Sequence, residues 1–571
     1  MRSRYFVGLP VLAIFVITFA RLHTASAQPP RDWWENAVIY EIYPRSFGDT
    51  NGDGIGDLNG ITQHLDYLKD LGVDGIWITP FYPSPQVDFG YDISDYRGID
   101  PQYGTMQDFD RLVAEAKKRN IRIIIDLVLN HTSDQHPWFI ESKSSRTNPK
   151  ADWYMWRDGK SNGQPPNNWI SLFGHSAWQY VSSRNQYYYH EFYKEQPDLN
   201  WRNPQVKNAM WDAVRFWMDR GVSGFRLDAI TALFEDPEFR DEKFLPGYNA
   251  YGDRNVSREY TDNLPQVHDI LRELRGVTDK YSGSLLIGET YLYNAKDLLK
   301  MYGLHGPELQ LPMDTQLGFQ NHLSASAFRR PLVEAETELE GHVPLFVFDN
   351  HDNDRSWNRY GDGVHNLAIA KLIATLLLTP RCSALVYYGQ EIGMEERAPQ
   401  RKEDVRDPIG KIGWPKEKGR DGERTPMQWN GNTDAGFSSA AQTWLPVEPD
   451  FKTRNVSLEA QQPGSLLNYY KALIRLRKQN RALREGVFVP LDSENGSVLS
   501  YLRKPQNGGA VLVALNFSGT EQVMNFDLAA QGISGKRART VLASWAPPSE
   551  SMPVTHIELP PFAAFVGELE P

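Results

Sequence analysis

The chain alternates between two patterns of apolar and polar residues. Short runs rich in β-branched and aromatic residues, typical of strands, are followed by longer segments with the apolar spacing of an amphipathic helix, such as FDRLVAEAKKRN (109–120) and VKNAMWDAVRFWMDRG (206–221). Strands are predicted at 38–47, 75–82, 121–130, 224–230, 285–290, 310–316, 343–350 and 383–390, and the proline of the sixth weakens that prediction. Eight strands alternating with helices predict an α/β fold whose parallel sheet closes into a (β/α)8 barrel, the TIM barrel.

Three segments depart from this alternation. Residues 131–200, rich in Trp, Tyr, Asn and Pro, follow the third strand and predict an inserted subdomain that overhangs the active face as a lid. Residues 391–440 are charged and loop-rich, which is typical of a solvated face, but their less polar RTPMQW (424–429) is expected to fold back. From about Arg484, short alternating strands (VLSYLRKP, AVLVALNFS, PFAAFVGEL) predict a C-terminal antiparallel β-sandwich.

The first 30 residues have the pattern of an export signal. Arg2 and Arg4 precede an apolar stretch (6–20), and Ala25-Ser26-Ala27 supplies small residues at a cleavage site. The stretch is short for a membrane span, and an uncleaved anchor is the alternative. We expect cleavage after Ala27 and export to the bacterial periplasm or the medium, with no membrane attachment afterwards. The predicted parts are a signal peptide (1–27), a catalytic barrel (28–130 and 201–480), a subdomain (131–200) and a sandwich (481–571).

Composition and charge exclude several classes of protein. With 571 residues, 40% of them apolar, the chain can bury a large core in several domains. Its net charge of −11 and its lack of any basic block exclude nucleic acid as the partner. The single cysteine, Cys382, excludes an internal disulfide, and its apolar surroundings in the sequence indicate a packed side chain.

Three carboxylates lie at the ends of separate predicted strands. Asp228 lies in GFRLDAI (224–230), Glu289 in SLLIGET (284–290), and Asp352 ends VPLFVFDNHD (343–352). In a (β/α)8 barrel the carboxyl ends of the strands converge on one pocket, so these acids are expected to face one another. Cleavage of a glycosidic bond needs such a group: one acid protonates the leaving oxygen and another, ionised, meets the positive charge that develops on the sugar.

Six motifs in order resemble the α-amylase family, glycoside hydrolase family 13. They are GYDISDY (90–96), DLVLNH (126–131), QPDLNW (196–201), GFRLDAI (224–230), GET (288–290) and FDNHD (348–352). The resemblance covers nearly the whole chain after the predicted signal. Within the family, QPDLN and RTPMQW look most like the oligo-1,6-glucosidase and α-glucosidase group.

The resemblance implies a role for each acid. Asp228 would be the nucleophile, Glu289 the general acid/base and Asp352 a transition-state stabiliser. Arg226, two residues before Asp228 on a strand, points to the same face and is expected to favour the ionised nucleophile. Glu289 has no cation beside it in the sequence and follows apolar residues, so a raised pKa is expected for it.

The resemblance also implies residues that bind the cleaved glucose. His131 and His351 would bond its hydroxyls, and Tyr91 would form the platform on which it stacks, with a core tyrosine as the alternative. Asp88 and Arg424 are predicted to pair and bind the terminal glucose at its 4- and 6-hydroxyls, closing the pocket beyond one sugar, or else to form a surface ion pair. Phe173 would wall the same pocket. Arg355 is placed on the aglycone side.

The expected activity is that of a retaining exo-acting α-glucosidase. Ala229, the residue after the nucleophile, accompanies α-1,4 cleavage in the resembled group, where valine accompanies α-1,6 cleavage; the expected substrates are therefore maltose and short malto-oligosaccharides, with transglycosylation as a side reaction. A glucosyl transferase or isomerase of the family, such as a sucrose isomerase or trehalose synthase, and an oligo-1,6-glucosidase are the alternatives. The sequence leaves open whether the protein is a monomer or a homodimer.

A separate loop, DTNGDGIGD (49–57), has the spacing of a calcium site. Asp49, Asn51, Asp53 and Asp57 match positions one, three, five and nine of a calcium loop, and Ile55 would offer its carbonyl. The glutamate expected at position twelve is missing, so the loop is not a complete EF-hand. The resemblance also places a structural Ca²⁺ here, with Mg²⁺ as the alternative ion. An Asx-rich turn without an ion is the competing interpretation.

Overall fold

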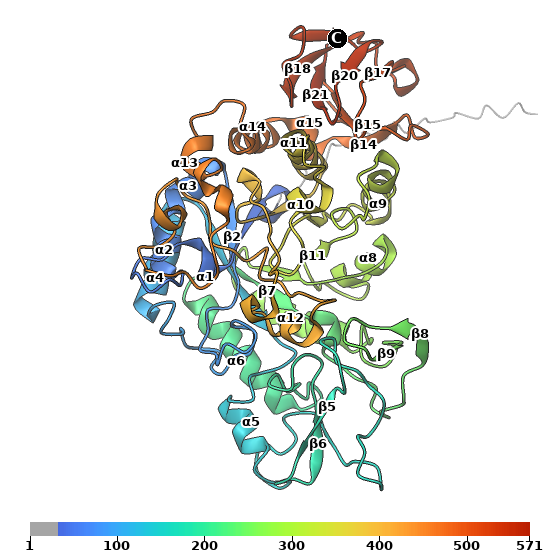
Figure 1. The fold of residues 1–571 in the computed structure, drawn as a ribbon. Helices are drawn as coiled ribbons and strands as arrows, with labels where there is room; N and C mark the ends of the chain where they lie inside the picture. The colour runs from blue at the N-terminus through green and yellow to red at the C-terminus, as the bar shows by residue number, and fades with distance from the viewer. Residues whose placement is uncertain (1–31, 571) are drawn as a thin grey trace, which may run out of the picture. The chain divides into compact units, whose positions relative to one another are not determined.

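A computed structural model describes residues 32–570 (Figure 1). The predicted signal peptide (1–27) lies outside the described residues. Residues 33–570 lie in one compact unit. None of the helices in the described part of the chain is both long and apolar enough to cross a membrane.

Eight parallel strands close into a barrel, as the sequence predicts. In spatial order they are β1 (Val38–Ile42), β13 (Ser383–Tyr387), β12 (Leu345–Val347), β11 (Leu311–Asp314), β10 (Leu285–Gly288), β7 (Gly224–Asp228), β3 (Arg122–Val128) and β2 (Gly75–Ile78). The sixth predicted strand is confirmed as β11, which contains Pro312. It pairs with β10 on one side and β12 on the other through only two residue pairs each, so the hydrogen bond that the proline nitrogen cannot donate costs this strand little.

Helices follow the strands around the barrel (Figure 1). The principal ones are α3 (Leu65–Leu71), α4 (Met106–Lys118), α6 (Pro204–Asp219), α7 (Val267–Thr278), α8 (Ala295–Gly303), α9 (Ala325–Glu338), α11 (Asn366–Leu378) and α14 (Leu466–Gln479). Both helices predicted from apolar spacing are present as α4 and α6. In α4, Thr105 and Asp108 form a reciprocal capping box that starts the helix, and Phe109, Leu112 and Ala116 are its buried face.

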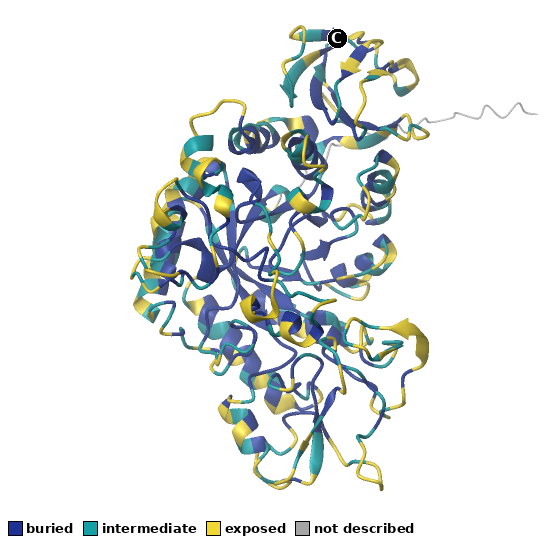
Figure 2. Ribbon diagram, in the orientation of Figure 1, coloured by how far each residue is buried: buried dark blue, intermediate teal, exposed yellow. Residues whose placement is uncertain are grey.

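Alternation along the strands divides the core in two. Side chains that point into the barrel form one apolar cluster, which includes Ile39, Trp77, Ile124, Ile287 and Leu385. Side chains of the opposite register, such as Ile76 and Ile125, join the helices in a larger cluster. Figure 2 shows the result: the barrel strands are buried, whereas most of the helices around them carry both buried and exposed residues. The inward register therefore decides which residues reach the mouth of the barrel.

The segment after β3 contains its own small sheet. Strands β4 (Trp156–Arg157), β6 (Gln186–Tyr189) and β5 (Trp178–Val181) pair antiparallel, and α5 (Pro137–Ser142) precedes them. Further along the chain, between β7 and α7, β8 (Phe244–Tyr248) and β9 (Arg254–Val256) form an exposed hairpin.

The C-terminal region is antiparallel, as predicted. One sheet has the order β14 (Val487–Leu491), β15 (Val498–Lys504), β16 (Val511–Asn516), β21 (Ala564–Leu569), β18 (Arg537–Ala543) and β19 (Ser551–Pro553), and a second pairs β17 (Gln522–Met524) with β20 (Ile557–Leu559). Leu502 and Leu512 pack with Met524 and Ile557 between the two sheets. Their neighbours Tyr501 and Val513 belong instead to the larger cluster that the barrel strands form with the helices, so alternate residues of the same strands serve two packing faces.

Candidate active site

The inward register places polar residues at the mouth of the barrel. Two positions beyond the inward-facing Ile39, Ile124 and Ile287, the same register brings Glu41, Asp126 and Glu289 to the carboxyl ends of β1, β3 and β10. On β7 it brings Arg226 and Asp228, and Arg226 lies directly across from Asp126 in the paired strands. The positions of Glu41, Asp126, Asp228 and Glu289 follow from the same alternation that builds the core below them.

Arg226 is the buried cation that organises this mouth. Its guanidinium donates to Asp228 Oδ1 at 2.6 Å and contacts Glu289 Oε1 at 2.5 Å. It also donates to Asp126 Oδ1 at 3.1 Å, and only 1% of its side chain is exposed. Glu289 has no cation beside it in the sequence, but it contacts Arg226 in space because β7 and β10 are adjacent. Three carboxylates share one positive charge, which leaves an excess of negative charge that a proton relieves.

Burial sets the protonation of the two central acids. Burial raises the pKa of Glu289 to about 7, against the lowering effect of Arg226 and with further raising by Asp228 and Asp352. Burial likewise raises the pKa of Asp228 to about 7, and here too Arg226 only partly offsets it. Arg226 does favour the ionised form of Asp228, as expected, but burial has the larger effect on its pKa. Near neutral pH the Asp228–Glu289 pair holds about one proton between its two carboxyls.

Ala229 adopts a left-handed backbone conformation directly after Asp228. Its φ is +45°, which non-glycine residues rarely adopt. In this conformation its backbone N–H donates to Glu289 Oε2 at 2.8 Å. The turn therefore ties the residue after Asp228 to Glu289 and presents the Ala229 methyl group to the pocket.

Asp352 stands among cations. Arg420 and Arg424 each donate to Asp352 Oδ1 at 2.9 Å. Burial by itself would raise the pKa of Asp352, but the neighbouring His351, Arg420 and Arg424 outweigh it and hold this pKa well below its usual range. Asp352 thus stays ionised under conditions in which Asp228 and Glu289 share a proton.

The predicted partner of Asp88 is corrected by the structure. Asp88 Oδ1 accepts from Arg420 Nη2 at 2.8 Å, so Arg420, and not Arg424, links Asp88 to Asp352. Arg424 lies behind Asp352, 1% exposed, with its Nε bonded to the carbonyl of His351 at 2.7 Å. The two arginines are four residues apart, and only the first reaches the pocket. Asp407 fixes Arg420 from outside, at 2.7 Å from its Nε.

The remaining predicted glucose-binding residues surround this group. The Tyr91 and His351 rings stack at 5.3 Å, and the Tyr91 hydroxyl contacts His351 Nε2 at 2.7 Å. Glu41 holds the other nitrogen of His351 at 2.6 Å. His131 lies 3.0 Å from Gln196, which also donates to Asp88, and burial lowers the pKa of His131 to about 3, so its ring is neutral.

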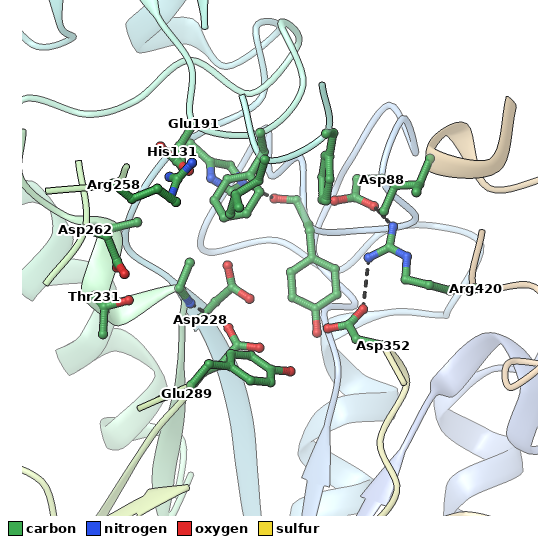
Figure 3. Close-up of a pocket in the computed structure, with 18 of the residues that line it drawn as sticks. Asp88, His131, Glu191, Asp228, Thr231, Arg258, Asp262, Glu289, Asp352 and Arg420 are labelled. Atoms are coloured by element: carbon green, nitrogen blue, oxygen red, sulfur yellow. Dashed lines mark hydrogen bonds and ion pairs between the residues drawn. The ribbon is translucent and has the colours of Figure 1, made fainter. Parts of the chain in front are cut away.

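These residues enclose a pocket of about 430 Å³. Asp88, Tyr91, His131, Phe173, Asp228, Glu289 and Asp352 line it, whereas Arg226, His351 and Arg424 lie behind its wall and act through the residues they bond. Figure 3 shows Asp228, Glu289 and Asp352 turned towards a common space, with Arg420 bonded to Asp88 and Asp352.

Sequence reasoning missed several residues of this pocket. Arg420 lies in the charged segment that predicted a solvated face. It is four residues before Arg424, the arginine that the sequence did assign to the pocket, and this closeness was the available signal. Glu191 and Arg258 form an ion pair in the pocket wall, from two separate insertions of the barrel, and no motif marks either. Met427, Gln428 and Trp429 are buried, which confirms that RTPMQW folds back.

Arg355 does not line the aglycone side. It is fully buried and donates to the carbonyls of Tyr388 at 2.9 Å and Glu423 at 2.8 Å. Its role is to hold the loop after β12 against the segment that carries Arg420 and Arg424.

The predicted metal loop is folded around its own hydrogen bonds. Asp49 accepts from the backbone of Gly52 and Gly54, both at 2.8 Å. Asp57 accepts from the backbone N–H of Thr50 and caps α2 (Leu58–Gln63). Asn51 and Asp53 form Asx turns: the Asn51 side chain accepts from the N–H of Asp53, and the Asp53 side chain accepts from the N–H of Ile55. Within residues 32–570, no group of three or more His, Cys, Asp or Glu side chains is placed to hold a metal ion. The oxygen-rich donor set suits Ca²⁺ or Mg²⁺, and the metal site stays a prediction based on spacing.

Comparison with known proteins agrees with the geometry. Residues 41–486 match the family model of the α-amylase catalytic domain. A probable α-glucosidase of Rhizobium meliloti (strain 1021) is 44% identical over 84% of this chain and 88% of its own length. An oligo-1,6-glucosidase of Parageobacillus thermoglucosidasius is 40% identical over 86% of this chain and 91% of its own.

Among solved structures, the α-glucosyl transfer enzyme XgtA superposes with a TM-score of 0.87 at 38% identity, covering 95% of this chain and all of its own. The barrel, the converging carboxylates and these matches lead to one conclusion: the chain belongs to the α-amylase family, glycoside hydrolase family 13, and is a glycoside hydrolase of its α-glucosidase and oligo-1,6-glucosidase group.

Proposed function

We propose that this protein is a retaining, exo-acting α-glucosidase that removes terminal glucose from maltose and short malto-oligosaccharides. The observation that carries the proposal is the shared contact of Arg226 with Asp228 and Glu289, which line a pocket bridged by Asp88 and Arg420. Retention requires carboxyls about 5–5.5 Å apart, whereas inversion needs a wider gap for a water molecule. Two carboxyls held by one guanidinium favour the shorter separation.

The first step uses the single proton of the pair. Protonated Glu289 donates to the glycosidic oxygen while ionised Asp228 attacks the anomeric carbon, so the bond to the aglycone breaks as the bond to Asp228 forms. The Ala229 N–H bonded to Glu289 keeps that carboxyl aimed into the pocket. Asp352, held ionised by its neighbours, supplies negative charge near the sugar as positive charge develops on it.

The second step reverses the proton transfer. Glu289, now ionised, takes a proton from a water molecule, the oxygen of which attacks the anomeric carbon and releases Asp228. The product is α-glucose. If a sugar hydroxyl takes the place of water, the same intermediate yields a new glycoside.

Exo action is supported by the Asp88–Arg420 bridge. Asp88 is 4% exposed and the side chain of Arg420 12%, and both lie at the edge of the pocket with Phe173 beneath the guanidinium at 5.6 Å from the ring centre. A bridge of two charged groups over this end leaves no passage for further sugar units. Its oxygens and nitrogens suit the 4- and 6-hydroxyls of a terminal glucose.

The α-1,4 preference is supported by Ala229. Its methyl group lines the pocket next to both catalytic acids, where a larger side chain would narrow the space for the second sugar. A methyl-sized difference of this kind discriminates by about 10- to 200-fold, so the preference is graded. The oligo-1,6-glucosidase relative makes α-1,6 cleavage the second candidate.

Glucosyl transfer is the third candidate. The structural similarity to an α-glucosyl transfer enzyme favours it, as do the exposed Tyr291 and Tyr293 beside the pocket, on which an acceptor sugar could stack.

One experiment separates the three candidates. Initial rates are measured on maltose, isomaltose, sucrose and p-nitrophenyl α-glucoside, and the anomer released first is identified by NMR. We expect the highest kcat/KM on maltose with α-glucose as the first product. Release of β-glucose would refute retention, a higher rate on isomaltose would establish the α-1,6 activity, and a majority of new disaccharides would establish the transferase.

A further inference from the structure

A second cavity adjoins the active-site pocket and has no role in the steps above. Its volume is about 830 Å³, and it is formed by the loops after β10 and β11 and the start of α9. Tyr291 and Tyr293 line both cavities, so the two spaces meet at these side chains. A molecule too long for the first pocket meets the second directly beyond this pair.

The wall between the cavities is aromatic and accessible. Tyr293 is 91% exposed, far more than most tyrosines in a folded protein, and Tyr291 is 45% exposed. Tyr291 stacks on Phe319 with ring centres 6.3 Å apart and planes 21° from parallel. Open aromatic faces beside a sugar-cleaving site are suited to the apolar faces of pyranose rings.

The rest of the second cavity combines polar side chains with the apolar Leu292, Phe319, Ala327 and Pro331, and it is nearly uncharged. Its other lining residues include Thr315, Gln316, Gln320, His322, Ser324 and Ser326. The one arginine, Arg330, is ion-paired with Glu334 at 3.3 Å. Amides, hydroxyls and an imidazole donate and accept hydrogen bonds without demanding a charged ligand, which matches the hydroxyl groups of a neutral sugar.

The aromatic wall is joined to the catalytic loop. The Tyr291 hydroxyl accepts from Asn350 Nδ2 at 3.4 Å and from Asn353 Nδ2 at 3.3 Å, on either side of Asp352. Tyr291 is also two residues after Glu289 in the chain. A sugar stacked on Tyr291 is therefore placed relative to both acids, while the Asp88–Arg420 bridge closes the opposite direction.

We propose that this second cavity binds the outlying sugar units of α-linked gluco-oligosaccharides on the reducing-end side, beyond the unit next to the cleaved bond. The inference rests on the proposed α-glucosidase function and adds that substrates of three or four glucose units are preferred to maltose. Tyr293 supplies the stacking face at the entrance, and His322 and the two glutamines supply hydrogen bonds inside.

The test compares substrates of increasing length. We measure kcat/KM for maltose, maltotriose, maltotetraose and p-nitrophenyl α-glucoside in the full protein and in the variants Tyr293→Ala and His322→Ala. Tyr293 is almost fully exposed, so its truncation leaves the fold intact. In each variant we expect the maltotetraose-to-maltose ratio of kcat/KM to fall about two- to tenfold, the size of one lost aromatic or hydrogen-bonding contact.

Tyr248→Ala is the matched control. Tyr248 is 70% exposed on the β8–β9 hairpin and lines neither cavity, so this variant should keep the wild-type ratio. Equal ratios in wild type, Tyr293→Ala, His322→Ala and the control would overturn the second cavity as a sugar site, provided that p-nitrophenyl α-glucoside is hydrolysed. If that substrate is not hydrolysed by the wild-type protein, the proposed α-glucosidase function itself fails.

Discussion

The two sides of the active-site pocket are built on different principles. On the closed side, which we define as Asp88, Asp352 and Arg420, every side chain is held by ion pairs and is largely buried. On the outer side, defined as Thr231, Asp262, Tyr291 and Tyr293, the residues come from the segments that follow β7 and β10, and two of them are exposed aromatics. Figure 3 shows Thr231 and Asp262 across the pocket from Asp88 and Arg420.

The difference separates two tasks. Groups fixed by several charged partners cannot move without breaking buried ion pairs, which suits the recognition of one invariant terminal sugar. Exposed side chains on loops cost little to rearrange and can meet different aglycones. Chemistry and terminal-sugar recognition are therefore expected to depend on the barrel and its closed side, and substrate choice on the outer side.

The largest effect is expected at the nucleophile. Asp228→Ala removes the proposed nucleophile, and kcat on p-nitrophenyl α-glucoside should fall by about 10⁴-fold or more, with the circular dichroism spectrum unchanged. Asp262→Ala removes an aspartate on the outer side of the same pocket and should cost less than about tenfold. Turnover retained by the first variant, or equal losses in both, would contradict the division between the two sides.

Breaking the closed side comes next. Arg420→Ala leaves Asp88, Asp352 and Asp407 without their shared cation, and kcat/KM should fall by about 10²–10³-fold, as when a preorganised charged contact is removed. Loss of one partner from a buried ion pair also destabilises the fold by about 3–5 kcal/mol, which a melting curve measures.

Arg401→Ala is the control for that variant. Arg401 lies in the same charged segment, with 70% of its side chain exposed in a pair with Asp404, and should retain wild-type activity and stability. A normal kcat/KM in Arg420→Ala would show that the bridge does not bind the substrate.

The closed side also shows how far the sequence could predict this site. Asp228 and Glu289 were predictable because strand alternation places them at the carboxyl ends of inward registers, and the barrel followed from the same alternation. The partner of Asp88 was not: Arg420 and Arg424 lie more than 300 positions from Asp88, and only the path of the loop decides which of them turns inward. The charged composition of that loop pointed to solvent, whereas Asp407, Glu423 and Arg424 are buried.

Electrostatics were the least accessible to sequence reasoning. Arg226 was visible two residues before Asp228, but its simultaneous contacts with Asp126 and Glu289 depend on the strand order β3–β7–β10. A cation shared among three acids stabilises the ionised form of each less than a cation bound to one acid alone would. Burial therefore raises the pKa of Asp228 by more than Arg226 lowers it. Glu191 and Arg258 belong to insertions with no periodicity, so their pairing had no signal in the chain.

A smaller effect is expected where the outer side meets the acids. Ala229→Val should raise the isomaltose-to-maltose ratio of kcat/KM by about 10- to 200-fold, because the larger side chain narrows the space for an α-1,4-linked second sugar. Ala229→Thr adds a β-branched side chain of similar volume at the same left-handed backbone position. If side-chain volume decides the linkage, this variant should raise the ratio about as much as Ala229→Val does. An unchanged ratio in Ala229→Val would remove Ala229 as a determinant of linkage.

The pH dependence reports the shared proton. In the proposed mechanism, activity needs the Asp228–Glu289 pair to hold one proton. As pH falls, the pair takes a second proton and loses its nucleophile; as pH rises, it loses the first and has no acid. Both pKa values are raised to about 7, so kcat/KM on maltose should be bell-shaped around neutral pH, falling about tenfold per unit on either side. With p-nitrophenyl α-glucoside, whose leaving group needs little acid assistance, Glu289→Gln should lose the alkaline fall. An alkaline fall that persists in this variant would assign it to another group.

The smallest effect on catalysis is expected from the metal loop, which supports the closed side from outside. The backbone N–H of Asp49 donates to the carbonyl of Phe437 at 2.9 Å, and Trp444 donates to that of Gly54 at 3.0 Å, so the loop braces the segment that follows Arg420 and Arg424. If Ca²⁺ binds there, a hundredfold excess over its Kd stabilises the fold by about 2.7 kcal/mol. A chelator should then lower the Tm by a few degrees, with kcat at 25 °C nearly unchanged, and added Ca²⁺ should restore it. Asp53→Ala, which removes an exposed carboxylate that would bind the ion, should abolish the response of the Tm to the chelator and to Ca²⁺. If neither the chelator nor Ca²⁺ changes the melting curve, the loop does not bind the ion, and its Asx turns support the closed side without it.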